Sequence, residues 1–138
     1  MIRVLVVDNA KIIREKICAI LAEHPEFTAV AQASTATEAI ELAKEHQPDV
    51  VLLDVSMPHL NGLQASPIIK KVAPQAEIMI VTQYDNPIFV REAFAVGARG
   101  FLIKRDVGAE LHTAVSEVFL KRKFVSRSLQ NVLLDPAS

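Results

Sequence analysis

Val50-Val51-Leu52-Leu53-Asp54-Val55-Ser56-Met57-Pro58 is the stretch that decides the fold. Four aliphatic residues lead directly into one carboxylate, and a proline follows four residues later. A short apolar run without alternation is typical of a strand buried on both faces, as in parallel sheets. An acid at the carboxyl end of such a strand lies at the sheet edge where α/β proteins bind ligands. Asp54 is therefore the first candidate functional residue.

The rest of the chain repeats this strand pattern and alternates it with helical patterns. Aliphatic runs predict strands near residues 4–7, 27–31, 49–53, 77–82 and 100–103, each followed by an apolar helical pattern. Five strand–helix units without a hairpin signal predict an α/β domain whose parallel sheet is covered on both faces. Right-handed crossovers favour a flavodoxin-like, doubly wound, five-stranded sheet in the order 2-1-3-4-5.

The third helix contains a proline, which limits where that helix can begin. Pro67 fits a first helical turn but not a helix interior, so we expect a start near Ser66 or a weakened first turn. Ile68 in this helix and Phe119 in the last one are expected to face the core.

The composition is that of an ordinary folded domain. The chain has 138 residues, of which 51% are hydrophobic and 22% are charged, and its net charge is −1. These values argue against disorder and against nucleic-acid binding through a basic patch. No apolar run approaches the roughly 18 residues of a membrane span, and no signal peptide is visible. Cys18 is the only cysteine, which is compatible with a reducing cytoplasm, so we expect a cytoplasmic domain.

Polar residues stand at the ends of four predicted strands. Asp8 and Asn9 end the first strand, Asp54 the third, Thr82 the fourth and Lys104 the fifth. Because the carboxyl ends of parallel strands share one sheet edge, these side chains should converge. A single polar residue at a strand end is common and needs no functional explanation. The same explanation accounts poorly for polar residues at four strand ends that share one edge.

This set of side chains suits an aspartyl-phosphate site. Two carboxylates with an amide or main-chain carbonyl fit Mg²⁺, and a carboxylate beside that ion can attack a phosphoryl group. Lys104 and Thr82 would contact the phosphoryl oxygens by charge and by hydrogen bond. The sequence contains no glycine-rich phosphate loop and no Asp-x-Asp hydrolase pattern. The four histidines show no metal-ligand spacing: His24, His46, His59 and His112.

Motifs around the strand ends carry a resemblance to a known family. They are Val6-Val7-Asp8, Leu52-Leu53-Asp54-Val55-Ser56-Met57-Pro58 with Gly62, Thr82, and Gly97-Ala98-Arg99-Gly100-Phe101-Leu102-Ile103-Lys104. Together they resemble the receiver domain of bacterial two-component response regulators, over about residues 2–122. The resemblance implies that Asp54 is the phosphoacceptor, which takes the phosphoryl group from the phosphohistidine of a sensor histidine kinase.

The same resemblance implies roles for the surrounding residues. Asp8, Asp54 and the main-chain carbonyl of Ser56 would hold Mg²⁺, with Asn9 in a fourth metal position, and Thr82 and Lys104 would contact the phosphoryl group. The resemblance also implies that Phe101 is an aromatic switch that turns inward, and that Ser56, Gln83 and Tyr84 tune access to the phosphoryl group and its lifetime. For Phe101, a plain core aromatic is an equal alternative.

Three departures from the family pattern qualify the resemblance. Asn9 stands where a second acid is usual, so Mg²⁺ binding is expected to be weaker than in other receivers. Gln83 replaces a usually small residue and is expected to crowd the approach to Asp54. Arg105 replaces a common proline after Lys104, and this form looks most like the NarL/LuxR-type subfamily, whose members carry a C-terminal helix-turn-helix DNA-binding domain.

The expected domain organisation follows from this resemblance. Residues 1–122 should form the receiver, and residues 123–138 a linker with a short helix and a polar tail, leading to a helix-turn-helix domain absent from this chain. A stand-alone receiver is the alternative. The implied partners are a sensor histidine kinase, a possible second copy of the chain, and DNA only through the absent domain, with no membrane.

Two classes of function remain open. The first is a phosphorylation switch, with no enzymatic activity beyond its own phosphorylation and dephosphorylation. Phosphorylation would change the surface formed by the fourth helix, fifth strand and fifth helix, and so control an output, expected to be transcription. The second is a phosphorylation-independent pseudo-receiver that acts as an interaction module, for which Asn9 and Gln83 are the signs. A small hydrolase with Asp54 as nucleophile is a third reading.

Overall fold

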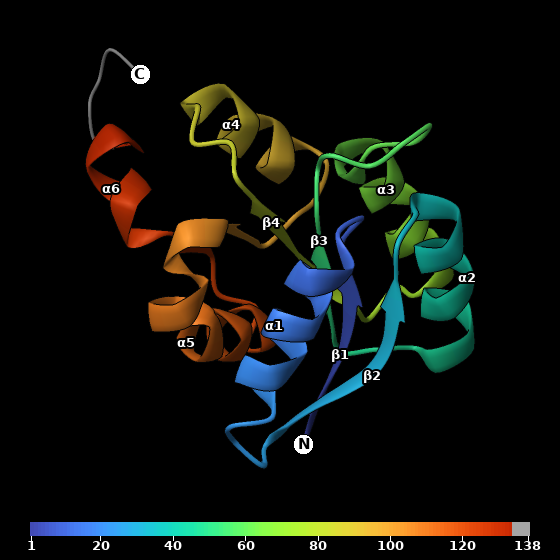
Figure 1. Cartoon of the computed structure of the whole chain (residues 1–138). Coiled ribbons are helices and arrows are strands. Elements are labelled where there is room, and N and C mark those ends of the chain that lie inside the picture. The colour runs from blue at the N-terminus through green and yellow to red at the C-terminus, as the bar shows by residue number, and fades with distance from the viewer. Residues whose placement is uncertain (134–138) are drawn as a thin grey trace.

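A six-stranded parallel sheet runs through the molecule in the order β2-β1-β3-β4-β5-β6 (Figure 1). The structure is a computed structural model, and it describes residues 1–133. Its strands are β1 (Ile2–Val7), β2 (Phe27–Ala33), β3 (Val50–Leu53), β4 (Glu77–Thr82), β5 (Gly100–Ile103) and β6 (Phe124–Val125). The predicted parallel, doubly wound sheet is present, but the predicted number of five strands is wrong. The sequence pattern missed β6 because a two-residue strand has no aliphatic run to reveal it.

Helices cover both faces of this sheet. They are α1 (Lys11–Leu21), α2 (Ala36–His46), α3 (Gly62–Val72), α4 (Pro87–Ala95), α5 (Val107–Phe119) and α6 (Arg127–Leu133), with a 3₁₀ turn at Lys104–Asp106. Apolar side chains of α1 and α5 belong to the core on one face, and those of α2, α3 and α4 belong to the core on the other (Figure 1). No helix within residues 1–133 has the length and apolar character needed to cross a membrane.

Strand β3 lies inside the sheet with an apolar core on each face, which explains why its sequence does not alternate between apolar and polar residues. Val50 and Leu52 pack into the core under α1 and α5, whereas Val51 and Leu53 pack into the opposite core. All four side chains are buried, and each contributes about 1.5–3 kcal/mol through its removal from water. Asp54 follows immediately, so the strand fixes that carboxylate at the carboxyl edge of the sheet.

Helix α3 begins earlier than the proline predicted. Asn61 and Gln64 form a reciprocal capping box: the Asn61 side chain accepts from the Gln64 N–H at 2.8 Å, and the Gln64 side chain accepts from the Asn61 N–H at 3.0 Å. These bonds satisfy two free backbone donors and start the helix at Gly62. The predicted start near Ser66 is therefore wrong, and Pro67 lies inside the helix on its exposed side.

Two residues predicted to face the core lie at the surface. Ile68 is 40% exposed, because the buried face of α3 is formed by Gly62, Ala65, Ser66 and Ile69. Phe119 is 39% exposed, because it is the last residue of α5 and follows the buried Val118. Helical spacing identified both helices, but it assigned to the buried face one residue, next in sequence to a buried one, that lies at the surface.

The segment after residue 122 closes one edge of the sheet. β6 pairs with β5 in parallel, with Val125 beside Phe101. The Ser126 N–H donates to the Phe101 carbonyl at 2.9 Å, and the Ser126 hydroxyl accepts from the Ile103 N–H at 2.6 Å. Leu129 of α6 is buried in the same apolar cluster as Phe101. The predicted polar tail, residues 135–138, lies outside the described residues.

Candidate functional site

Two carboxylates lie side by side at the carboxyl edge of the sheet. β1 and β3 are neighbours, with Val7 beside Leu53, so Asp8 and Asp54 follow directly from adjacent strand ends. The Asp54 N–H donates to the Val7 carbonyl at 3.1 Å and continues the ladder by one residue. Both acids are buried, with exposed fractions of 2% and 3%. Buried carboxylates need compensation by a cation or by hydrogen bonds.

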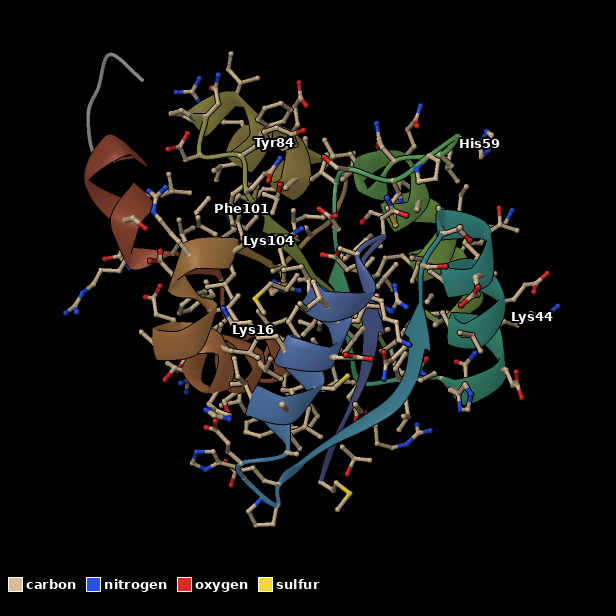
Figure 2. The ribbon with its side chains drawn as sticks, in the orientation of Figure 1. Lys16, Lys44, His59, Tyr84, Phe101 and Lys104 are labelled. Atoms are coloured by element: carbon tan, nitrogen blue, oxygen red, sulfur yellow. The ribbon has the colours of Figure 1, made fainter. Side chains whose placement is uncertain are left out.

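Lys104 provides a cation between the two acids. It follows β5, and its Nζ lies 2.8 Å from Asp8 Oδ2 and 3.3 Å from Asp54 Oδ2. The Lys104 side chain is 22% exposed, so solvent still reaches the site along it. Figure 2 shows Lys104 with Phe101 and Tyr84 along the same end of the molecule. The convergence predicted for Asp8, Asp54 and Lys104 is thus present in the structure.

Main-chain amides fix the orientation of both carboxylates. The Ala10 N–H donates to Asp8 Oδ1 at 2.8 Å, and the Ser56 N–H donates to Asp54 Oδ1 at 3.3 Å. The Oδ2 atom of each acid is the one that faces Lys104. Each carboxylate therefore uses one oxygen for positioning and turns the other toward the centre of the site.

The charges in this cluster shift the pKa values of two of its members. Burial raises the pKa of Asp54, and the neighbouring charge of Asp8 raises it further, while Lys104 and the Ser56 N–H oppose the shift. Burial by itself lowers the pKa of Lys104, but the hydrogen bond to Asp8 and the charges of Asp54 and Asp8 outweigh it, and the net pKa is raised. The raised pKa keeps Lys104 cationic at neutral pH, and the raised pKa of Asp54 means that its negative charge is less favourable here than in water.

A glycine allows helix α3 to approach Asp54 closely. A Cβ atom on Gly62 would lie 2.1 Å from the main-chain oxygen of Asp54 and 2.9 Å from its carbonyl carbon. Both are backbone atoms, so neither could move without displacing the strand end. The Gly62 N–H also donates to the Val55 carbonyl at 3.2 Å, which ties the loop after β3 to the start of α3. The absence of a side chain at Gly62 is therefore a condition for the position of Asp54.

Thr82 and Phe101 are both fully buried. Thr82 ends β4 and pairs with Ile103, the residue before Lys104. Its Oγ1 accepts from the Tyr84 N–H at 3.2 Å. Phe101 has no exposed surface and lies in the apolar core on the α4 side of the sheet. The inward position predicted for Phe101 after phosphorylation is already its position in this structure, and the switch role stays a prediction.

The loops after β3 and β4 meet above the site. The Ser56 hydroxyl and the Tyr84 hydroxyl are 2.9 Å apart and hydrogen bonded, and the Tyr84 ring lies 5.3 Å from that of Phe89. The sequence placed Ser56 and Tyr84 near the site but gave no signal that they bond to each other, because 28 residues separate them. Gln83 and Asn9 are exposed, so their predicted roles stay predictions.

One contact to the acidic cluster was missed by sequence reasoning altogether. The Arg14 guanidinium of α1 donates to the main-chain oxygen of Asp8 at 2.6 Å. In the sequence Arg14 is one of several charged residues on an amphipathic helix, and helical spacing cannot distinguish it from its solvated neighbours. This contact holds the strand end beneath the Asp8 side chain, while Lys104 neutralises the side chain itself.

The chain is similar in sequence to known proteins. Residues 4–116 match the family model described as the response regulator receiver domain. The chain is 32% identical over 117 residues to the transcriptional regulatory protein DegU of Brevibacillus brevis, covering 85% of this chain and 50% of DegU. It is 32% identical over 133 residues to the response regulator GacA of Pseudomonas aeruginosa, covering 96% of this chain and 62% of GacA.

A solved structure also aligns with nearly the whole chain. The crystal structure of a two-component response regulator of the LuxR family, from Aurantimonas sp. SI85-9A1, has a TM-score of 0.90 at 30% identity. The alignment covers 95% of this chain and 94% of that one. The curated relatives are longer, and this chain spans between half and about three fifths of the length of the two named above.

Proposed function

The chain belongs to the response regulator receiver family, and from this membership we propose that it is a phosphorylation-controlled switch whose phosphoacceptor is Asp54. The resemblance predicted from the sequence, including the resemblance to LuxR-type regulators, is confirmed. Receiver domains of this family are signalling switches rather than conventional enzymes. The phosphoacceptor, the metal ligands and the output described next are proposals for this chain.

The environment of Asp54 is the observation that supports this proposal most directly. Its Oδ1 is fixed by the Ser56 N–H at 3.3 Å, and its Oδ2 faces the ammonium of Lys104 at 3.3 Å. Burial and the charge of Asp8 raise the pKa of this carboxyl, so its negative charge is destabilised relative to water. We propose that Asp54 Oδ2 is the oxygen that accepts the phosphoryl group, because the carboxylate is held in place and its negative charge is only partly offset by Lys104.

The oxygen donors around Asp54 fit a hard divalent cation, and receiver domains generally bind Mg²⁺ at this acidic pocket. Asp8 Oδ2 is buried and pairs with the Lys104 ammonium, whose Nζ lies 2.8 Å away. A carboxylate oxygen that accepts from one ammonium keeps a further lone pair for a metal cation. We propose Asp8, Asp54, the Ser56 carbonyl and the neutral Asn9 as the metal-binding residues. When bound, the ion would offset the two carboxylates and stabilise charge on the phosphoryl oxygens.

The proposed transfer proceeds from a phosphohistidine on a sensor histidine kinase. An Asp54 oxygen attacks phosphorus, an O–P bond forms as the N–P bond breaks, and the electron pair of the broken bond returns to the donor imidazole. Lys104 and the Thr82 hydroxyl would then contact the phosphoryl oxygens. In the present structure Lys104 contacts Asp54 itself, and Thr82 Oγ1 accepts from the Tyr84 N–H. Both side chains would exchange these partners on phosphorylation.

The proposed output surface consists of α4, β5 and α5. Thr82 links the site to this surface, because the Tyr84 N–H that it binds belongs to the loop before α4. A change at Thr82 would move Tyr84 and the start of α4, which biases that surface toward a partner or a second copy of the chain. We propose a transcriptional output through a DNA-binding domain outside residues 1–138, because the longer DegU relative is named a transcriptional regulatory protein. A cytoplasmic location belongs to the same proposal.

Phosphorylation by a small donor tests the proposal. The wild-type chain is incubated with acetyl phosphate and Mg²⁺, and intact mass spectrometry measures phosphoryl incorporation. We expect one phosphoryl group on the wild type, none on Asp54→Asn, and wild-type labelling on Asp85→Asn, whose carboxylate is exposed outside the cluster. Beryllofluoride binding in the presence of Mg²⁺ provides a parallel readout.

Failure of both readouts would favour the alternative function. If neither acetyl phosphate nor beryllofluoride distinguishes the wild type from Asp54→Asn, the chain acts as a phosphorylation-independent interaction module. Labelling that requires unusually high Mg²⁺ would instead support the role proposed for Asn9, since a neutral ligand attracts a divalent cation less than a carboxylate does.

A further inference from the structure

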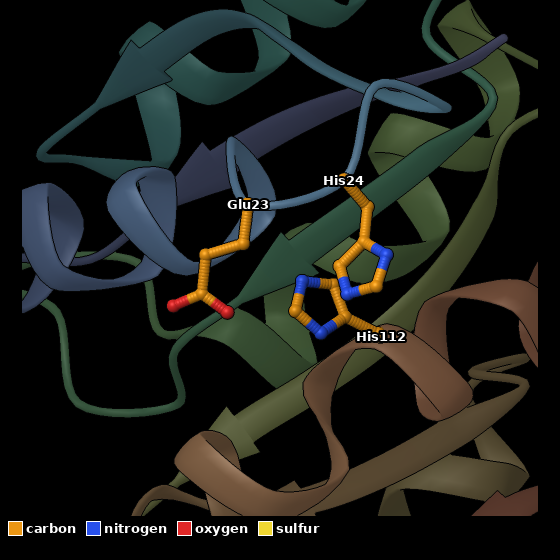
Figure 3. A group of neighbouring side chains, drawn as sticks. All are labelled: Glu23, His24 and His112. Carbon is orange, nitrogen blue, oxygen red and sulfur yellow. The ribbon is translucent and has the colours of Figure 1, made fainter.

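A second cluster of potential ligands lies at the opposite edge of the sheet. Glu23 and His24 follow α1 and precede β2, whereas His112 projects from α5 (Figure 3). One ligand atom from each of the three side chains lies within 4.8 Å of the other two. The sequence gave no sign of this group, because 88 residues separate the two histidines and no metal-ligand spacing links them.

Two contacts orient the His112 ring. Its Nε2 lies 2.6 Å from the main-chain oxygen of Ile20. A carbonyl oxygen can only accept, so Nε2 carries the proton and Nδ1 of the neutral ring keeps its lone pair. The ring also packs against Phe27, with centroids 5.4 Å apart. Metal-bound histidines typically donate their second ring N–H to a carbonyl or carboxylate in this way, which fixes the tautomer and the ring orientation.

We propose that Glu23, His24 and His112 form a binding site for a divalent transition metal ion, with Zn²⁺ as the best match. Two imidazoles and one carboxylate are ligands that Zn²⁺ takes, and water can complete a four-coordinate shell. Ligands on one Zn²⁺ lie about 3.3 Å apart, from bond lengths of about 2.0–2.1 Å. The rings of His24 and His112 already lie with centroids 4.0 Å apart, and the exposed Glu23 and His24 side chains can rotate to close the remaining distance.

The ligand chemistry separates this site from the acidic cluster. Mg²⁺ prefers oxygen ligands and retains several waters, which fits Asp8 and Asp54, whereas imidazole favours later transition metals. Glu23 and His24 precede a strand, so they lie at the amino edge of the sheet, while Asp54 follows a strand at the carboxyl edge. Zn²⁺ here would join the end of α1 to α5 and is independent of phosphorylation at Asp54.

Zinc binding by the full, untagged chain tests this proposal. Isothermal titration with Zn²⁺ is carried out in excess Mg²⁺, so that the acidic cluster is occupied by its preferred ion. We expect one Zn²⁺ per chain and a rise in thermal midpoint with Zn²⁺, because a ligand that binds only the folded state stabilises it. Co²⁺ as a substitute should give the visible absorption of a nitrogen- and oxygen-ligated site.

Three variants and one matched control locate the ion. Glu23→Gln and His24→Ala alter exposed side chains, so both should fold, and each should weaken Zn²⁺ binding by about tenfold or more. His112→Ala should do the same, and circular dichroism checks its folding. His46→Ala removes a histidine at the end of α2, on the other face of the sheet, and should bind Zn²⁺ like the wild type. No zinc binding, or equal binding by His24→Ala and the wild type, would overturn the proposal.

Discussion

Replacement of Lys104 by methionine tests the electrostatic balance of the acidic cluster. Methionine keeps an apolar stem but removes the ammonium that lies 2.8 Å from Asp8 Oδ2 and 3.3 Å from Asp54 Oδ2. With an effective dielectric constant of about 20, the two attractions amount to roughly 6 and 5 kcal/mol before desolvation is counted. The desolvation of Lys104 offsets most of this, and loss of one partner from a buried ion pair typically costs about 3–5 kcal/mol. Because Lys104 is partly exposed, we expect a loss of about 3 kcal/mol.

Urea unfolding of Lys104→Met in metal-free buffer measures this loss. The expected fall in the unfolding midpoint is roughly 1.5 M for a slope near 2 kcal/mol per M. Mg²⁺ should restore more stability to the variant than to the wild type, because the ion supplies the cation that the two acids have lost. Lys11→Met is the matched control: Lys11 is 80% exposed and pairs with Glu15 at the surface, so its replacement should cost less than about 0.5 kcal/mol.

Two outcomes would refute this reasoning. A Lys104→Met free energy of unfolding within about 0.5 kcal/mol of the wild type, in the absence of metal, would show that the ion pair contributes little beyond its own desolvation. An equal gain from Mg²⁺ in both proteins would show that the ion does not bind between Asp8 and Asp54.

Three further predictions concern the same site. Asn9→Asp should raise Mg²⁺ affinity on the order of tenfold, measured by calorimetric titration, and an unchanged affinity would remove Asn9 from the metal site. The pKa of Asp54 is raised in the folded protein, so at pH values between the ordinary pKa of 3.8 and the raised pKa the folded state binds more protons than the unfolded state. Without metal, the free energy of unfolding therefore falls as the pH rises through this interval. Asp54→Asn should therefore exceed the wild type in stability at pH 7 without Mg²⁺, with the difference shrinking in acid; a difference independent of pH would contradict the shift. Gly62→Ala should lower the free energy of unfolding in urea by about 1–3 kcal/mol and slow phosphorylation. Gly108→Ala is the control, because a Cβ there meets nothing within 4 Å, and it should raise the free energy of unfolding by up to about 1 kcal/mol. Similar effects at both positions would refute the close approach at Asp54.

The residues at the strand ends could be predicted from sequence because aliphatic runs mark the buried strands of a parallel sheet. Each run fixes a strand, and parallel strands place their carboxyl ends together, so Asp8, Asp54 and Lys104 converge without any long-range information. The helix interiors were predictable for a similar reason, since spacing reveals the apolar face. The start of α3 was not, because the Asn61–Gln64 capping box outweighed the preference of Pro67 for a first turn.

The contacts that sequence could not reveal all join segments far apart in the chain. The Ser56–Tyr84 hydrogen bond depends on how two loops approach each other, and neither loop has a periodic pattern. The pairing of His24 with His112 depends on how α1 packs against α5. Strand β6 is too short for its own pattern and forms because β5 offers it a partner. Such features follow from tertiary packing and not from local preference.

Strand β6 also bears on the solubility of the domain. Without residues 124–126, the Arg99 and Phe101 carbonyls would lose the N–H groups of Phe124 and Ser126, and the Ile103 N–H would lose the Ser126 hydroxyl. β5 would then be a bare edge of four buried, largely apolar residues, which is a template for edge-to-edge aggregation. A receiver shortened at residue 122 should consequently self-associate, although every residue of its acidic cluster would be intact.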